Sequence, residues 1–206
     1  MTLGEGYEDW KIYPVYEVFY IEQIRSASNS ITESWELLNE IVNNPEQLKN
    51  EWDRTIDLAE SIVSQAGVLS RYFFPPKDFK KKNADKNRIH ELRSEKLRDY
   101  YLIDEENILK DRKFRNHIEH FDENLDGFLN NPIAGTITPK RLFWRTTDID
   151  NITTVFKAYV VEEFKFISLS EEIELIPVVT EIYRIYNLSI YFLDNGGRLQ
   201  TFEEQN

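Results

Sequence analysis

Residues 115–120 of this 206-residue chain read Arg-Asn-His-Ile-Glu-His, and these side-chain types together could do chemistry. Histidine can transfer a proton near neutral pH. Arginine presents a fixed fork of donors that matches phosphate oxygens and stays charged, and asparagine can orient an imidazole or a sugar hydroxyl. The set therefore suits cleavage of an RNA phosphodiester by attack of the 2′-hydroxyl, a reaction that needs no metal.

Helical spacing decides which of these side chains share a face. At about 100° per residue, a helix places Arg115, Asn116, Glu119 and His120 on one polar arc. His117 falls at the boundary beside the apolar stripe, which consists of Phe114, Ile118, Phe121, Leu125 and Phe128. We expect Arg115 and His120 to act together. Glu119 either repels phosphate or pairs with Arg115 at i,i+4.

This stretch resembles the motif of the HEPN superfamily: an arginine, a polar residue directly after it, and a histidine a few positions later. Arg115 and His120 fit the spacing, with Asn116 in the polar position. Arg112 and His117 have the same spacing, but a lysine follows Arg112. We therefore take the first pair as the better match.

The resemblance implies a homodimeric helical bundle in which two motifs meet in one cleft. It implies a metal-independent endoribonuclease of a bacterial toxin–antitoxin or phage-defence system, with RNA as substrate and an antitoxin protein as partner. His120 would be the general acid or base, Arg115 the stabiliser of the transition state, and Asn116 the orienting group. The alternative is a non-catalytic HEPN-like module that binds a protein partner or a nucleotide.

The charge distribution bears on RNA binding. Thirty-seven acidic and 25 basic residues give a net charge of −12, which argues against broad, nonspecific nucleic-acid binding. Residues 77–98, however, carry nine basic and four acidic side chains, so this window is +5 and the rest is −17. The window is either a solvated face or a phosphate-attracting strip. In the second case we expect RNA contacts from Lys80, Lys81, Lys82, Arg88 and, beyond the window, Arg112.

Other chemistries are disfavoured. The chain has no cysteine, which excludes disulfides, thiolate zinc sites and cysteine nucleophiles. It also lacks a phosphate-binding glycine loop and a Gly-x-Ser-x-Gly elbow. His117 and His120 could share a metal with nearby Glu119, Asp122 and Glu123, but His90 is the only other imidazole and no further element offers a clear ligand. We expect no metal and no cofactor.

Apolar periodicity predicts the elements that carry the motif. Spacings of three and four residues predict two long helices joined at Asn43-Asn44-Pro45, hence an antiparallel hairpin. Further helices are expected at about 84–101, 104–129 and 171–193, the last one capped by Ser168 or Ser170 and ended by Asn195-Gly196-Gly197. Residues 155–159 and 164–167 predict a β-hairpin, and 141–145 a less secure third strand.

These elements predict a mainly α fold: a HEPN-like bundle of about five helices with a small β-hairpin insert before the last helix. Residues 1–197 would form one domain, with the β-rich insert at about 133–170, and 198–206 an acidic C-terminal tail. No apolar run approaches the roughly 18–20 residues that span a bilayer, and the N-terminus has no signal-peptide pattern. We therefore expect a cytoplasmic protein without a membrane partner.

Overall fold

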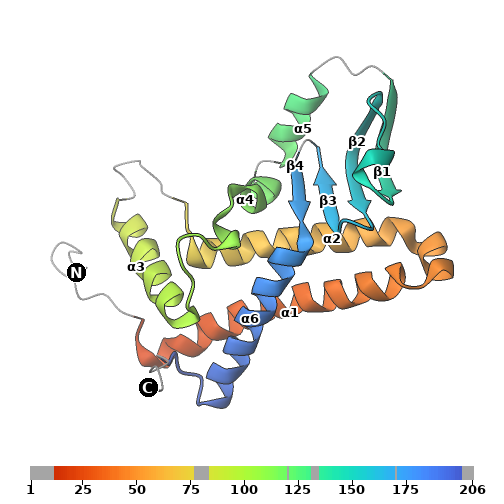
Figure 1. Ribbon diagram of the computed structural model, residues 1–206. Coiled ribbons are helices and arrows are strands. Elements are labelled where there is room, and N and C mark those ends of the chain that lie inside the picture. The colour runs from red at the N-terminus through yellow and green to blue at the C-terminus, as the bar shows by residue number, and fades with distance from the viewer. Residues whose placement is uncertain (1–11, 77–83, 120, 131–134, 170, 201–206) are drawn as a thin grey trace.

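The computed structural model describes residues 12–76, 84–119, 121–130, 135–169 and 171–200, without the side chains of 84–88, 115, 118 and 119 (Figure 1). Within these ranges the fold is mainly α with a small sheet, as expected. Its elements are α1 (Pro14–Val42), α2 (Pro45–Phe73), α3 (Ala84–Tyr101), a 3-10 turn (Ile108–Lys110), α4 (Arg112–Glu119), α5 (Phe121–Leu129), β1 (Thr136–Phe143), a second 3-10 turn (Thr146–Asp148), β2 (Thr153–Val160), β3 (Lys165–Ser168), β4 (Glu171–Glu174) and α6 (Leu175–Asp194).

Helices α1 and α2 form the predicted antiparallel hairpin, the long base of the molecule in Figure 1. Asn44 caps α2, because its side-chain oxygen accepts a hydrogen bond from the Gln47 N–H at 3.2 Å. Pro45 occupies the first turn, where its missing N–H costs nothing. The side chain of Gln47 donates to Glu51 at 3.2 Å rather than completing a capping box.

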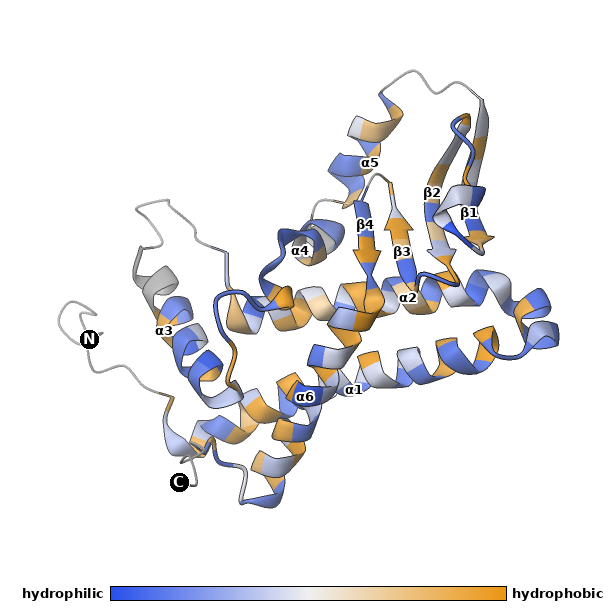
Figure 2. Cartoon of the chain, viewed as in Figure 1, coloured by the Kyte–Doolittle hydropathy of each residue, from blue (hydrophilic) through white to orange (hydrophobic). Residues whose placement is uncertain are grey.

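The main core lies between this hairpin, α6 and the inner face of the sheet, and apolar residues face it from each element (Figure 2). Tyr101 is buried between Phe73 and Phe192, with ring centroids at 5.5 and 5.3 Å. Its hydroxyl lies 3.0 Å from that of Ser189. No helix in the described ranges combines the length and the apolar character that crossing a bilayer requires.

The single helix predicted over 104–129 is wrong: this segment forms a 3-10 turn followed by two short helices, α4 and α5. Asp104, Asn107 and Asp111 each accept a hydrogen bond from the backbone N–H two residues later, at 2.9 to 3.0 Å. Such local side-chain contacts compete with helical hydrogen bonds. Asn107 caps the start of the 3-10 turn and Asp111 bonds the first turn of α4, so each begins a new element instead of continuing one helix.

The four strands form one sheet in the order β1-β2-β3-β4, in which β1 and β2 are parallel and the other pairs are antiparallel. The predicted hairpin is confirmed as β2 and β3, and the third strand as β1, with different bounds. On one face, Tyr159 and Phe166 join the main core. A second small cluster is formed by Phe143, Val155, Ala158, Val160 and Ile167.

Residues 171–174, predicted as the start of the last helix, form strand β4 instead. Ile173 pairs with Phe166 in the antiparallel register and is 4% exposed, while the three flanking glutamates are exposed. A strand can accommodate this pattern because its side chains alternate between two faces, so Ile173 is buried while the glutamates beside it are exposed. The sheet therefore extends one strand beyond the predicted insert.

Helix α6 begins at Leu175, with Glu174 as its N-cap residue. Ser168, one of the two predicted caps, lies in β3 and does not cap the helix. The other, Ser170, lies outside the described residues. The predicted C-terminus is confirmed, because the helix ends before Gly196, whose φ of 86° suits glycine.

Candidate functional site

Helix α4 carries the predicted motif as far as Glu119. The backbone of Arg115 lies within this helix, but its side chain lies outside the described residues, as does the whole of His120. Asn116 is exposed. The joint action of Arg115 and His120 therefore stays a prediction.

The inner face of α4 is set by Phe114 and His117, which are three positions apart and so lie on one side of the helix. Phe114 is 2% exposed and belongs to the main core. The side chain of His117 is 6% exposed. The boundary position predicted for His117 is thus an interior one, and α4 packs on α2 through this face.

His117 faces a carboxylate that sequence spacing did not suggest. Its Nε2 lies 3.5 Å from Glu60 Oε1 of α2, the outer limit of hydrogen-bonding distance. Lys157 of β2 reaches the same oxygen at 2.6 Å. His117 and then Lys157 lower the pKa of Glu60 to about 2, against the opposing effect of burial. By distance, Lys157 makes the firmer contact of the two.

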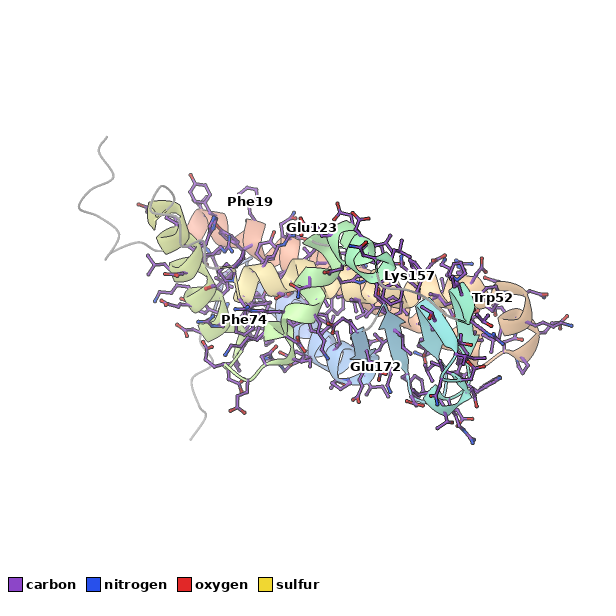
Figure 3. The ribbon with its side chains drawn as sticks, turned by 90° about the horizontal axis from the view of Figure 1, so that it is seen from above. Phe19, Trp52, Phe74, Glu123, Lys157 and Glu172 are labelled. Carbon is purple, nitrogen blue, oxygen red and sulfur yellow. The ribbon has the colours of Figure 1, made fainter. Side chains whose placement is uncertain are left out.

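Aromatic rings enclose this charged group. The His117 ring meets Phe121 and Phe166 edge to face, each with a centroid separation of 5.7 Å. Lys157 Nζ lies 4.8 Å from the centroid of the Phe121 ring, a cation–π contact. Figure 3 shows Lys157 where α5 meets the sheet. The network of Glu60, His117 and Lys157 therefore ties α2, α4, α5 and the sheet together.

A pocket of about 380 Å³ opens beside α4 and α5. Polar side chains from four elements line it, among them Lys113, Asn116, His117, Asn124 and Ser168. The Ser168 hydroxyl is buried and has no hydrogen-bond partner among the described residues. Lys113 Nζ lies 3.3 Å from a backbone oxygen of β4 and 4.0 Å from the Asp111 carboxylate. This pocket offers one cation, two amides and one unsatisfied hydroxyl to a ligand.

The lining also includes Glu171, an exposed acid that would repel an anion. The pocket therefore favours an anion that sits toward Lys113 and Asn116 rather than toward the β3–β4 turn. That position is next to the part of α4 that carries the predicted motif.

The basic window is only partly described. Lys80, Lys81 and Lys82 and the side chain of Arg88 lie outside the described residues, and Arg112 is exposed on α4. Two other basic side chains of the window serve packing, because Arg93 and Arg98 each donate to a backbone carbonyl oxygen near the end of α2 at 2.9 Å. They hold α3 against α2.

A metal centre finds no support in the described ranges, where no three histidine, aspartate or glutamate side chains are grouped as ligands. His117 is directed to Glu60 and Lys157, and an ammonium beside the same carboxylate opposes a second cation there.

Comparisons of the chain with models of protein families, with curated protein sequences and with solved structures find no match.

Proposed function

We propose that this protein is a metal-independent endoribonuclease whose reacting groups are Arg115, Asn116 and His120. The observation that supports this most is the position of Asn116, which is exposed on α4 and lines the polar pocket together with Lys113. A phosphate in that pocket would lie beside the helix that carries the motif.

The proposed reaction is an internal transfer at phosphorus. A histidine base takes the proton of the 2′-hydroxyl, the oxygen forms a bond to phosphorus, and the bond to the 5′-oxygen breaks. The departing oxygen takes a proton from a histidine acid. The products are a 2′,3′-cyclic phosphate and a 5′-hydroxyl. In a dimer that joins two motifs, His120 of each copy would supply one of these two proton transfers.

Arginine and lysine act on the charge that builds on the phosphoryl oxygens. The fork of Arg115 would bind two of these oxygens, and Lys113 would add a second positive charge from the pocket wall. Asn116 would orient the sugar hydroxyl or the imidazole.

His117 has a positioning role in this proposal. It is 6% exposed and directed to Glu60, so it anchors α4 on α2 and thereby fixes Asn116 at the pocket. His117 also lines the polar pocket, but only 6% of its side chain is exposed, so we assign it this positioning role rather than a proton transfer.

The test is cleavage of a labelled single-stranded RNA by the purified chain, with and without excess EDTA. We expect cutting that survives EDTA, yields cyclic-phosphate ends and leaves the matching DNA strand intact. Arg115→Ala should lower the rate by about 10²- to 10³-fold. Arg112→Ala, the matched control on the same helix, should be milder.

Two outcomes contradict the proposal. One is purified protein that cuts no RNA after every partner has been removed. The other is cleavage that stops with EDTA and returns with a divalent cation. Binding of RNA or nucleotide without cleavage would favour the non-catalytic module.

A further inference from the structure

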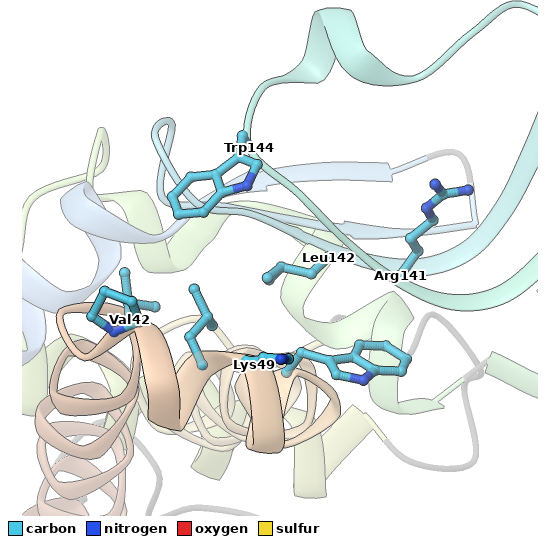
Figure 4. Close-up of a pocket in the computed structure, with 8 residues that line it drawn as sticks. Val42, Lys49, Arg141, Leu142 and Trp144 are labelled. Atoms are coloured by element: carbon cyan, nitrogen blue, oxygen red, sulfur yellow. The ribbon is translucent and has the colours of Figure 1, made fainter.

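A second pocket, of about 480 Å³, lies away from α4, between the α1–α2 connection and β1 (Figure 4). In Figure 4, Leu142 and Trp144 lie on the strand side, and Val42 and Lys49 lie on the helix side. Its volume falls within the range of about 300–1,000 Å³ that small-molecule sites occupy. The side chains that matter here are Leu48, Lys49, Trp52, Arg141, Leu142 and Trp144.

Two indole rings line this pocket and remain open to solvent. Trp52 is 39% exposed and Trp144 is 55% exposed. Large aromatic side chains gain stability when they pack against another ring. By contrast, Trp35 packs on Phe164 with a centroid separation of 5.8 Å. The pocket thus holds aromatic surface that the fold itself leaves uncovered.

Hydrogen bonds hold the backbone at both tryptophans. The carbonyl of Trp144 accepts a hydrogen bond from the Glu162 N–H at 3.0 Å. Helix α2 departs from helical geometry at Glu51, with φ −121° and ψ 25°, directly before Trp52. The Thr55 hydroxyl donates to the Trp52 carbonyl at 2.6 Å, a contact that bends helices.

The pocket is positively charged in an acidic protein. Lys49 and Arg141 line it, and no carboxylate does. In the described part of the chain neither cation has an ion-pair partner, whereas the neighbouring Lys140 pairs with Asp57. Figure 4 shows Arg141 at the rim with its guanidinium directed away from the helices. The Arg141 guanidinium lies 5.3 Å from the centroid of the Phe143 ring, a contact that leaves its charge without a carboxylate among the described residues. In a chain of net charge −12, two cations without an ion-pair partner in the described ranges, beside two indoles, favour an anionic ligand.

We propose that this pocket binds a small planar aromatic anion with the chemistry of a nucleoside monophosphate. The ring would stack on the indoles of Trp52 and Trp144 over the apolar floor, and the anionic group would meet Lys49 and Arg141. The pocket shares no lining residue with the pocket beside α4, so the proposal stands whether or not the chain cuts RNA.

The test uses adenosine 5′-monophosphate as probe, with adenosine and inorganic phosphate as its two halves. Of the four tryptophans, we expect the indole N–H signals of Trp52 and Trp144 to shift in an NMR titration, and that of Trp35 to stay. By calorimetry, adenosine should bind about tenfold more weakly than the monophosphate, because it lacks the contact with the two cations. Phosphate alone should give no measurable heat.

Variants separate stacking from charge. Trp144→Ala should weaken binding of the probe about 5- to 100-fold, the usual effect of removing one base-stacking ring. Arg141→Gln should weaken it about tenfold and make the monophosphate and adenosine bind alike. The control is Phe19→Ala, since Phe19 is 65% exposed and lies at the opposite end of the molecule from Trp52 (Figure 3). It should bind as the wild type does.

Three results would overturn the proposal. The first is no indole shift with the monophosphate at millimolar concentration. The second is equal binding of the monophosphate and adenosine by the wild type. The third is a loss in Phe19→Ala as large as that in Trp144→Ala. Because none of these readouts involves cleavage, an inactive enzyme leaves them unaffected.

Discussion

Replacing Glu60 by Gln removes the negative charge at the centre of the contact that joins α2, α4 and β2. Lys157 lies 2.6 Å from the carboxylate and His117 lies 3.5 Å from it. The Glu60 side chain is only 26% exposed, so water screens these charges weakly. Gln has the same shape and can still accept a hydrogen bond from Lys157, so the change removes charge with little loss of packing.

The magnitude follows from the pKa of Glu60, which falls from an ordinary 4.5 to about 2 on folding. Each pKa unit is worth about 1.4 kcal/mol, so the ionised carboxylate stabilises the fold by up to about 3 kcal/mol at pH 7. Because the folded pKa is the lower one, this stabilisation is complete above the unfolded pKa and disappears as the pH falls toward the folded one. By pH 3 about 2 kcal/mol of it should be lost.

The assay is urea unfolding of the wild type and Glu60→Gln at pH 7 and at pH 3. Glu163 also has a pKa lowered to about 2, first by Lys165 and then by the Thr146 N–H. It titrates equally in both proteins, so its effect cancels in the comparison. The control is Asp57→Asn, one turn earlier on α2, because the Asp57 side chain is 55% exposed and its pair with Lys140 should contribute less than about 1 kcal/mol. If the free energies of unfolding of the wild type and Glu60→Gln differ by the same amount at pH 7 and at pH 3, the reasoning is refuted.

Three further outcomes are expected. Replacing residues 80–82 by Gln should make RNA binding less dependent on salt, with the slope of log K against log salt reduced by about 0.7–0.9 per lost phosphate contact in fluorescence anisotropy. An unchanged slope would mean that the basic window is a solvated face. Light scattering at tens of micromolar should give twice the chain mass of 24.6 kDa, and a monomer would count against a cleft built from two motifs. Tyr101→Phe should cost about 1 kcal/mol in urea unfolding, since Ser189 keeps its own bond to a backbone carbonyl at 3.0 Å; a loss above about 3 kcal/mol would contradict this account of the core.

Local sequence signals predicted much of the fold. The stripes of α1 and α2 repeat every three or four residues, and the Asn44-Pro45 pair marks both a cap and a first helical turn. The β-branched and aromatic run of β2 and β3 identified the hairpin. The glycines after α6 marked its end, because only glycine adopts a φ of 86° without cost.

The errors arose where a local contact or a tertiary pairing overrides periodicity. The apolar stripe from Phe114 to Phe128 predicts one helix, but the side chains of Asp104, Asn107 and Asp111 each accept a backbone N–H before that stripe begins and so separate α4 from the preceding residues. Acidic residues 171–174 resemble a helix start, but Ile173 pairs with Phe166, a contact that sequence spacing does not encode.

The candidate site was predicted only in its position on the chain. Sequence spacing identified the α4 segment and the exposure of Asn116, but missed the contact of His117 with Glu60 and Lys157, which lie 97 positions apart. A signal for it exists in hindsight: Lys157 is a charged residue inside an apolar strand, and a charge at such a position needs a buried partner. The identity of that partner depends on how α2 packs against the sheet, which no local sequence pattern specifies.

The most direct test of the central claim compares the two histidines of the motif in one RNA-cleavage assay at neutral pH. His120→Ala should lose about 10²- to 10⁴-fold in rate with urea unfolding unchanged, as expected for a general acid or base. His117→Gln should unfold at lower urea because it disturbs the contact with Glu60, while the folded protein keeps most of its cleavage rate. If His120→Ala cuts RNA as fast as the wild type, or folded His117→Gln cuts none, the assignment of the reacting groups is wrong.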